Sequence, residues 1–409
     1  MNWGKVRFEE LYFSPSRNGI YKSADSHGSG IKIVNMGEIF AYDFIGNQEM
    51  QRISLSKEEY ERFGLQNGDL LFARRSLVES GAGKTSIVVE MNEPTTFESS
   101  IIRVRLDQEK CVPLFYHYWM RSLAGRTAIG ALVTGTNVKG IRGTALKDII
   151  VDYPDYTVQA RIADILKNYD NLIENNQKQI KLLEEAAQRL YKEWFVDLRF
   201  PGYEDTPIID GVPEGWYISN IGSLCSRVNA GGTPNRCNKN YWYDPTIKWF
   251  KTGELQDSWL IDSDEMISQE GLDGSSAKIF PKNTILMAIY ASPTLGRLGI
   301  LTSNSACNQA ALCLLADELK ISWQWLYCKL YELRDDFNAV AKGAGQQNIS
   351  ADTVKKKEVI VPTKRIIDEF NYLVAPMFEK RLNLQKQIKY LSHTRDRLLP
   401  KLMSGEIEV

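Results

Sequence analysis

The segment Gln177-Lys178-Gln179-Ile180-Lys181 recurs without change as Gln385-Lys386-Gln387-Ile388-Lys389, 208 residues further along the chain. At the same offset, Arg189-Leu190 recurs as Arg397-Leu398. A repeat at one fixed offset is the sequence mark of a duplicated architecture. The sequence therefore predicts two copies of one structural unit.

Matches in the same order continue toward the beginning of each half. Residues 31–39 line up with residues 247–255, and both stretches combine β-rich patterning with a Gly-Glu turn. The offset drifts by only a few residues, as differences in loop length would produce. Two further correspondences are Leu71-Phe72-Ala73 with Leu286-Met287-Ala288, and Gly83-Lys84 with Gly296-Arg297. Each repeat is thus a globular module followed by a helix.

A 4-3 spacing of apolar residues marks the two helical parts, and this spacing is typical of coiled coils. The first seam is Ile162, Leu166, Tyr169, Ile173, Asn176, Ile180, Leu183, Ala187, Leu190 and Trp194. The second seam is Phe370, Val374, Met377, Arg381, Leu384, Ile388, Leu391, Arg395, Leu398 and Leu402. We expect the two helices to pack against each other through these apolar seams. Pro376 removes a helix hydrogen bond and predicts a kink in the second helix.

Polar residues interrupt both seams at Asn176, Arg381 and Arg395. Three interpretations stay open: a device that sets the register, a point where another protein docks, or a tolerated polar residue on a solvated edge.

The fold class expected from these patterns is α+β. Short β-branched and aromatic runs such as residues 149–153 alternate with helical stretches and frequent turn residues. We expect two similar α/β modules separated by two long antiparallel coiled-coil helices, as a pseudo-twofold internal repeat. The boundaries that we predict are 1–157 and 199–362 for the modules, and 158–198 and 363–409 for the helices.

Composition limits the class of protein. Lys+Arg 50 against Asp+Glu 51 gives a formal charge of -1, so any DNA site must be local. The sequence has neither a signal-peptide pattern nor an apolar stretch of membrane-spanning length, which predicts a cytoplasmic protein without a membrane partner. The six cysteines form no CxxC pair, and we interpret them as reduced core thiols, not as a zinc or disulfide framework.

Motifs for catalysis are missing from the sequence. It has no Asp/Asn-Pro-Pro-Tyr/Phe tetrapeptide for base methylation and no GxGxxG after a strand. Residues 81–85 imitate a phosphate-binding loop, but Val78 stands where its first glycine is required and the strand follows the lysine. The acidic pairs Glu184-Glu185 and Asp335-Asp336 have no metal-ligand spacing, and we interpret them as solvated helix faces.

Four segments resemble a known family. They are Gln188 to Val196, Pro213-Glu214-Gly215-Trp216, Gly232-Thr233-Pro234 with Tyr241-Trp242, and Arg397 to Ile407. With the module–helix order, they make the whole chain similar to the specificity (S) subunits of type I restriction-modification systems. The first module departs from the pattern, because Ser14-Pro15-Ser16 stands where Gly-Thr-Pro is expected.

The resemblance implies a non-catalytic subunit whose two target-recognition domains each read one half of a bipartite site on double-stranded DNA. It implies two methyltransferase (M) subunits docked along the helices, and it leaves open whether restriction (R) motor-nuclease subunits join them. It implies no cofactor in this chain, with S-adenosylmethionine, ATP and Mg bound by the partner subunits. The alternatives are a self-sufficient DNA modification or restriction enzyme that shares these modules, and a protein-binding scaffold.

Candidate DNA-binding residues follow from the chemistry of base edges. Arg and Lys pair with guanine, and Asn and Gln pair with adenine. Loop residues with such side chains are Arg74, Arg75, Lys84, Asn137, Lys139 and Arg142 in the first module, and Thr233, Asn235, Arg236, Tyr290, Ser292, Thr294, Arg297, Gln346, Gln347 and Asn348 in the second. For Lys84 and Arg297, a phosphate contact and a solvated turn residue are equally plausible. Loops are polar in most proteins, so each assignment is a hypothesis.

Overall fold

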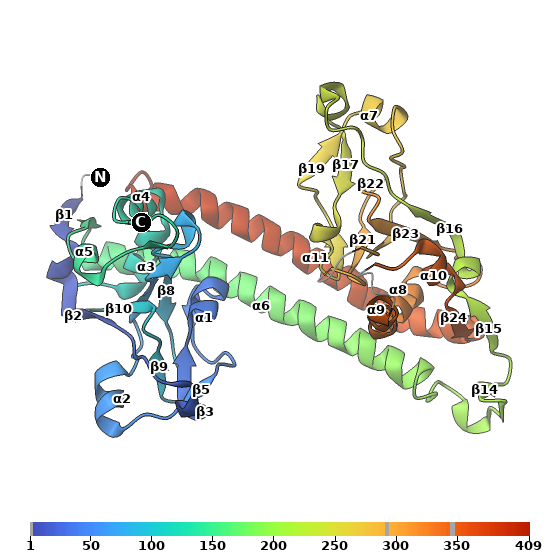
Figure 1. The fold of residues 1–409 in the computed structure, drawn as a ribbon, viewed down its shortest axis with the longest axis horizontal. Coiled ribbons are helices and arrows are strands. Elements are labelled where there is room, and N and C mark those ends of the chain that lie inside the picture. Colours follow the sequence, from blue (N-terminus) through green and yellow to red (C-terminus); the bar gives the residue numbers. More distant parts are fainter. Residues whose placement is uncertain (1–2, 291–293, 344–347) are drawn as a thin grey trace. The chain divides into compact units, whose positions relative to one another are not determined.

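The computed structural model describes residues 3–290, 294–343 and 348–409. Its contacts divide the chain into a first unit, Met1–Ile173 with Tyr390–Val409, and a second unit, Glu174–Lys389. Each unit contains one globular part and a stretch of each of the two long helices, α6 (Tyr156–Phe195) and α11 (Lys364–Met403) (Figure 1).

The first unit consists of twelve strands and five short helices in its described globular part. The strands are β1 Gly4–Arg7, β2 Tyr12–Asn18, β3 His27–Val34, β4 Phe44–Ile45, β5 Arg52–Ile53, β6 Leu70–Ala73, β7 Arg75–Ser76, β8 Thr85–Val88, β9 Thr95–Phe97, β10 Ile101–Leu106, β11 Lys139–Gly140 and β12 Ile150–Tyr153. The helices are α1 Met36–Ala41, α2 Lys57–Phe63, α3 Pro113–Arg121, α4 Leu123–Gly130 and α5 Gly143–Leu146.

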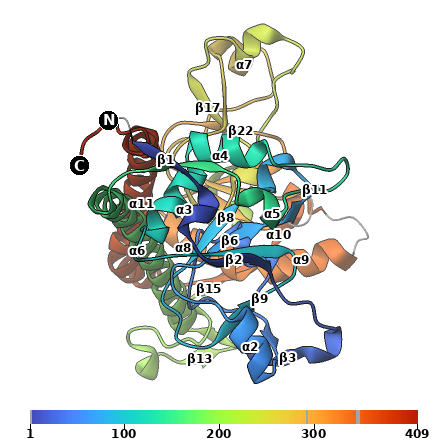
Figure 2. The same ribbon diagram turned by 90° about the vertical axis from the view of Figure 1, so that its left-hand side faces the viewer.

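A five-stranded sheet in the order β2-β10-β6-β8-β4 forms the centre of the first unit (Figure 2). Its pairings are antiparallel except for β4 with β8. Side chains alternate along a strand. Leu70 and Phe72 of β6 therefore pack in the cluster that contains α3 and α6, whereas Leu71 and Ala73 pack in a second cluster on the other face. Because both faces are covered, all four residues of β6 are buried and apolar.

The second unit has the same design. Its strands are β13 Ile208–Ile209, β14 Val212–Pro213, β15 Tyr217–Asn220, β16 Cys225–Ala230, β17 Ile247–Phe250, β18 Ser258–Leu260, β19 Glu265–Ile267, β20 Ile285–Ala288, β21 Leu298–Leu301, β22 Ala306–Cys307, β23 Ala311–Ala316 and β24 Glu358–Val361. Its short helices are α7 Gln269–Asp273, α8 Trp323–Glu332, α9 Arg334–Gly343 and α10 Ala351–Lys356.

Strand order confirms the duplication that the sequence predicts. The second sheet runs β16-β23-β20-β21-β18, and only β18 with β21 is parallel, as β4 is with β8. The smaller sheets β5-β3-β9 and β19-β17-β22 also match, each with one parallel pair. The aligned residues Val34 and Phe250 pair with Phe97 and Cys307 at equivalent places. The α+β class is confirmed.

Both predicted seams are buried or half-buried at every position. The helices run antiparallel within each unit. In the first unit, Asp170 pairs with Arg395, and the earlier Ile162 clusters with the later Leu402. In the second unit, Glu184 pairs with Arg381, and the earlier Asn176 pairs with the later Gln387. The polar seam residues are thus partnered inside the chain and do not lie on a solvated edge, while their role in register or in docking stays a prediction. Helix α11 continues without interruption through Pro376.

Two interpretations of side chains need correction. Cys237 is exposed and Cys225 half-buried, so these two are not core thiols like the other four. Glu184 is only half exposed to solvent at most, because it is half-buried against Arg381, and burial raises the pKa of its carboxyl group. Within the described ranges, no helix is long and apolar enough to cross a membrane.

Candidate nucleic-acid interface

Two segments of the first unit meet at the end of the sheet where β6 finishes. Strand β7 follows β6 after Arg74 and pairs with β11, so that Lys139 lies opposite Ser76 and Gly140 opposite Arg75. The amide of Ile141 also donates a hydrogen bond to the carbonyl of Arg74 (3.0 Å). Candidates that are far apart in the sequence therefore share one short two-stranded ribbon, β7–β11.

Several cations at this ribbon are available for a ligand. The side chains of Arg75, Lys139 and Arg142 have no hydrogen-bond or ion-pair partner among the described residues, and Arg75 and Arg142 are exposed. Arg74 and Arg142 line one pocket, and Arg74 also donates to the Ser99 carbonyl (3.4 Å). Asn137 is exposed in the loop that leads into β11.

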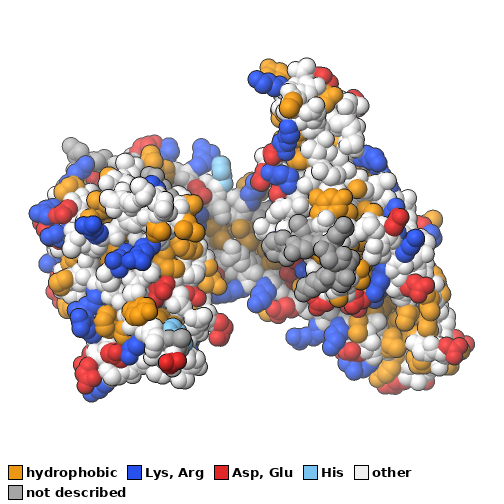
Figure 3. Space-filling view, in the orientation of Figure 1, with side chains coloured by type: hydrophobic (Ala, Val, Ile, Leu, Met, Phe, Trp, Pro, Cys, Tyr) orange, Lys and Arg blue, Asp and Glu red, His pale blue; other side chains and the backbone are white. Residues whose placement is uncertain are grey.

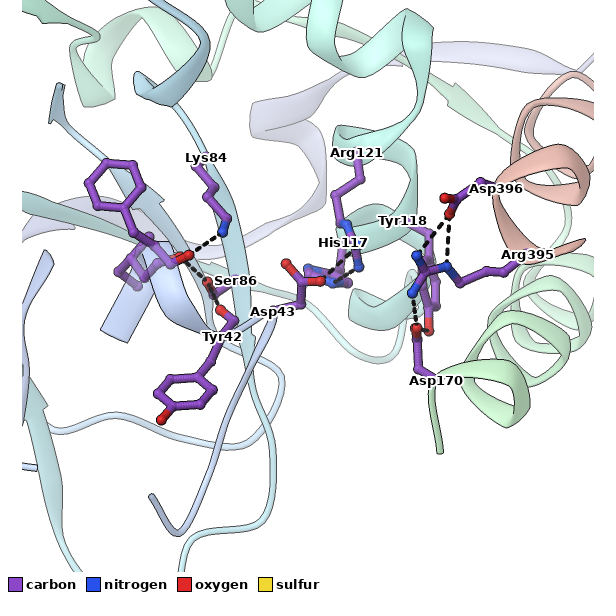
Figure 4. Close-up of polar contacts among 12 residues, drawn as sticks. Tyr42, Asp43, Lys84, Ser86, His117, Tyr118, Arg121, Asp170, Arg395 and Asp396 are labelled. Atoms are coloured by element: carbon purple, nitrogen blue, oxygen red, sulfur yellow. Dashed lines mark hydrogen bonds and ion pairs between the residues drawn. The ribbon is translucent and has the colours of Figure 1, made fainter. Parts of the chain in front are cut away.

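The repeated glycine–cation pair occupies equivalent positions in the two units. Gly83 and Gly296 have φ of 70° and 79°, where a side chain would be strained, and each donates an amide hydrogen bond of 2.8 Å to the last residue of β6 or β20. Lys84 then donates to the Phe40 carbonyl (2.7 Å) in the last turn of α1 (Figure 4). Arg297 is half-buried, and its side chain has no hydrogen-bond or ion-pair partner among the described residues. The strand β8 starts at Thr85, which excludes a phosphate-binding loop there.

Two arginines that the sequence reasoning missed hold these glycine turns. Arg126 of α4 donates to the carbonyls of Gly83 (3.3 Å) and Ser80 (2.7 Å). Arg334 of α9 donates to the Gly296 carbonyl (2.9 Å) and forms an ion pair with Asp257. No motif signals them, because each is recognisable only once the helix is placed beside the turn.

The second unit brings two of its candidates together at the same end of its sheet. Tyr290 forms a β-bridge with Asn348, and the Ile349 amide donates to the Ile289 carbonyl (3.0 Å), as Ile141 does to Arg74. The hydroxyl of Thr294 donates to the Tyr290 carbonyl (3.3 Å). The candidates Ser292, Gln346 and Gln347 lie outside the described residues.

The segment after β16 is engaged with the protein itself. Thr233 bonds to Gln309, and the Asn235 carboxamide accepts a hydrogen bond from the Cys237 amide (3.0 Å). Arg236 forms an ion pair with Glu265 and lies 3.9 Å from the centre of the Trp242 ring. The structure does not bring Arg236 to the Tyr290–Asn348 bridge.

The alignment of Ser14-Pro15-Ser16 with Gly232-Thr233-Pro234 was wrong. Gly231 donates to Ala311 as Gly19 donates to Ile101, and Gly232 donates to Cys307 as Ile20 donates to Phe97. Gly19 and Ile20 are therefore the true counterparts of Gly231 and Gly232. Residues 14–16 lie inside β2, opposite an irregular register with β10.

The described side chains contain no group of three or more His, Cys, Asp or Glu residues that could hold a metal ion. The described residues form two copies of one sheet, with a two-stranded ribbon at one end of the first and an isolated β-bridge at the same end of the second, together with two long helices.

The family model described as "Type I restriction modification DNA specificity domain" matches residues 2–185 and 213–388. The chain therefore belongs to the type I restriction-modification specificity subunits and is a non-catalytic subunit of that class. The alternative of a self-sufficient enzyme receives no support.

Relatives agree with this assignment. The chain is 26% identical over 345 residues to the type I restriction enzyme MjaIX specificity subunit of Methanocaldococcus jannaschii, covering 83% of this chain and 79% of the relative. It is 25% identical over 329 residues to the HindI specificity subunit of Haemophilus influenzae, covering 64% of this chain and 70% of the relative. The crystal structure of a type I S subunit from M. genitalium has the same fold, with a TM-score of 0.64, 16% identity and coverage of 98% and 96%.

Proposed function

We propose that each unit binds one short half of a bipartite site on double-stranded DNA through the ribbon end of its five-stranded sheet. The observation that supports this proposal is the recurrence of β-pairing at the same end of the sheet in both units, a ribbon in the first and the Tyr290–Asn348 bridge in the second, with cations beside the first whose side chains have no partner among the described residues. A two-stranded ribbon fits the major groove, and Lys and Arg side chains beside it can contact phosphates. The modules at 1–157 and 199–362 are the reading parts in this proposal.

Membership of the family supports a proposal for the partners. Two M subunits dock along the helices of residues 158–198 and 363–409, and these helices set the spacing of the two half-sites. The M subunits bind S-adenosylmethionine, while R subunits, where the system has them, bind ATP and Mg. The assembled complex works in the cytoplasm, where its DNA lies.

The test removes the cations at the ribbon. We expect R75A/K139A/R142A, in complex with M subunits, to bind its DNA about 10- to 100-fold more weakly at moderate salt. The dependence of log affinity on log salt should become shallower by about 2 to 3, because each lost phosphate contact releases about one counterion fewer. Fluorescence anisotropy at several salt concentrations measures both quantities, on a duplex chosen from the genome-wide methylated motif.

A matched control removes the same charge from the opposite end of the first sheet. Lys5, Lys110 and Lys147 lie on segments that adjoin the beginning of β2 or the end of β10: Lys5 is in β1, Lys110 follows β10, and Lys147 forms an ion pair with Glu9, which precedes β2. K5A/K110A/K147A should bind within about twofold of the wild type. Equal losses in both triple variants, or none in either, would contradict the proposed interface.

A further inference from the structure

The tip of the β7–β11 ribbon is apolar and exposed. Leu77 follows β7 and is 84% exposed, Val78 is 59% exposed, and Val138, which precedes β11, is 49% exposed. Leu77 directly follows Ser76 and Val138 directly precedes Lys139, and Ser76 and Lys139 are the pair at which the ribbon ends. Exposed hydrophobic and cationic side chains lie next to one another on the face of the first unit in Figure 3. Three aliphatic side chains are thus grouped where the ribbon ends.

Hydrogen bonds, not packing, hold this tip in place. Thr134 and Gly140 exchange two backbone hydrogen bonds of 2.9 Å, which close the loop that carries Val138. On the other side, Arg126 donates to the Ser80 carbonyl and the Val78 amide donates to the Ser76 hydroxyl (3.1 Å). The backbone is therefore tied down while the aliphatic side chains remain in water. Such a grouping of exposed apolar side chains marks a binding surface.

We infer that Leu77, Val78 and Val138 read the methyl group of a thymine in the first half-site. In the major groove, the apolar group that a base edge presents is the thymine C5-methyl. A ribbon that enters this groove brings its tip to the base edges, and Arg75 and Lys139 then lie beside the phosphates. This inference rests on the proposed function, and it predicts at least one A·T pair in the half-site that the first unit reads.

Replacing thymine with uracil tests the inference, because uracil lacks only this methyl group. With duplexes that carry deoxyuridine at single positions of the first half-site, we expect the wild-type complex to lose about fourfold in affinity at one position, the value of one buried methyl. The L77A/V78A/V138A complex should bind the thymine and uracil duplexes equally. F13A, which removes a 70% exposed side chain at the start of β2, should discriminate like the wild type.

Two results would overturn the inference. One is a wild-type complex that binds every uracil duplex as tightly as the thymine duplex. This result is also expected if the tip enters the minor groove, where no methyl group lies. The other is discrimination that survives in L77A/V78A/V138A. If R75A/K139A/R142A also binds like the wild type, the proposed interface falls together with the inference. If R75A/K139A/R142A does lose affinity, the failure concerns the thymine contact alone.

Discussion

The two units repeat one scaffold but present different chemistry on it. Both have the same strand order, the same positive-φ glycine turn and β-pairing beyond the same end of the sheet. The ribbon of the first unit pairs Arg75 with Gly140 and has Lys139 next to it, whereas the bridge of the second pairs Tyr290 with Asn348. The duplication has thus kept what holds the backbone and changed the side chains that face outward. This pattern suits a protein whose two halves must read different sequences.

The helices differ in a similar way. At the repeat offset, each polar seam residue corresponds to a buried apolar one: Asn176 to Leu384, Arg381 to Ile173, and Arg395 to Ala187. Arg395 pairs with Asp170, which also accepts a hydrogen bond from Tyr118 (Figure 4). Arg381 pairs with Glu184 and donates to the Asp257 carbonyl (3.0 Å). Each unit therefore has its own buried ion pair between the helices.

The largest effect is expected from removing Arg381, the more buried of the two arginines. Arg381→Met should lower the free energy of unfolding of the second unit by about 3 kcal/mol, because Glu184 loses its cation, while the Asp257 carbonyl keeps only the hydrogen bond from the Tyr327 hydroxyl. The Arg381 side chain is 3% exposed and that of Arg395 is 18% exposed. Asp170 also keeps the hydrogen bond from the Tyr118 hydroxyl, so Arg395→Met should cost less, about 1 to 2 kcal/mol, although Asp170 is more buried than Glu184. Urea unfolding of both variants measures the difference.

A double variant identifies the cause. Glu184→Gln in the Arg381→Met background removes the unpaired carboxylate and should recover about half of the loss. If Arg395→Met were the more harmful of the two single changes, the burial argument would be wrong.

The next largest effect is on the pH dependence of stability, which should differ between the two units because of the residues at one equivalent position. His117 and Tyr327 are each the fifth residue of the helix that follows the sheet, α3 or α8. Burial lowers the pKa of His117 well below its ordinary value of 6.5, helped by the charges of Arg121 and Lys167. The unfolded chain binds this proton and the folded ring does not. Stability from His117 is therefore present above about pH 6.5 and is lost below it, by up to about 1.4 kcal/mol per pH unit.

The second unit should respond in the opposite direction. Burial raises the pKa of the carboxyl groups of Glu184 and Glu318, so their contribution grows as the pH falls. From pH 7 to 5.5, hydrogen exchange should show about 1 kcal/mol less protection in α3 and no loss in α8. His117→Phe should remove the acid sensitivity of α3, and equal changes in the two helices would contradict the assignment.

Local patterns predicted the fold class and the duplication. A 4-3 spacing and a constant offset are properties of neighbouring residues, so the seams and the repeat could be read directly. The pairing of the strands could not be predicted from the sequence, because β4, β7 and β11 are two residues long and too short to show a strand periodicity. The mistaken alignment of Ser14-Pro15-Ser16 has the same origin, since only hydrogen bonds reveal that Gly19 is the counterpart of Gly231. The predicted domain boundaries stay predictions.

The kinds of side chain at the candidate site could be predicted from the sequence, but which of these residues lie together could not. The equivalence of Lys84 and Arg297 followed from the repeat, and the structure places both after the same glycine turn. That Arg75 and Lys139 share a ribbon depends on a pairing across more than sixty residues, for which no sequence signal exists. Whether the candidates contact DNA stays a prediction.

The smallest effect should come from making the two helices more alike. Asn176 is buried and donates to Gln387 (3.2 Å), whereas its repeat counterpart is Leu384. Asn176→Leu adds apolar burial to the seam, and the exposed Gln387 can turn its amide to water. We expect a gain of about 0.5 to 1 kcal/mol, because a polar seam residue fixes register at a cost in stability. Leu182→Asn, a change at a 64% exposed position of the same helix, should alter stability by less than about 0.5 kcal/mol. A loss in Asn176→Leu would mean that the Asn176–Gln387 pair stabilises the second unit and does more than set the register.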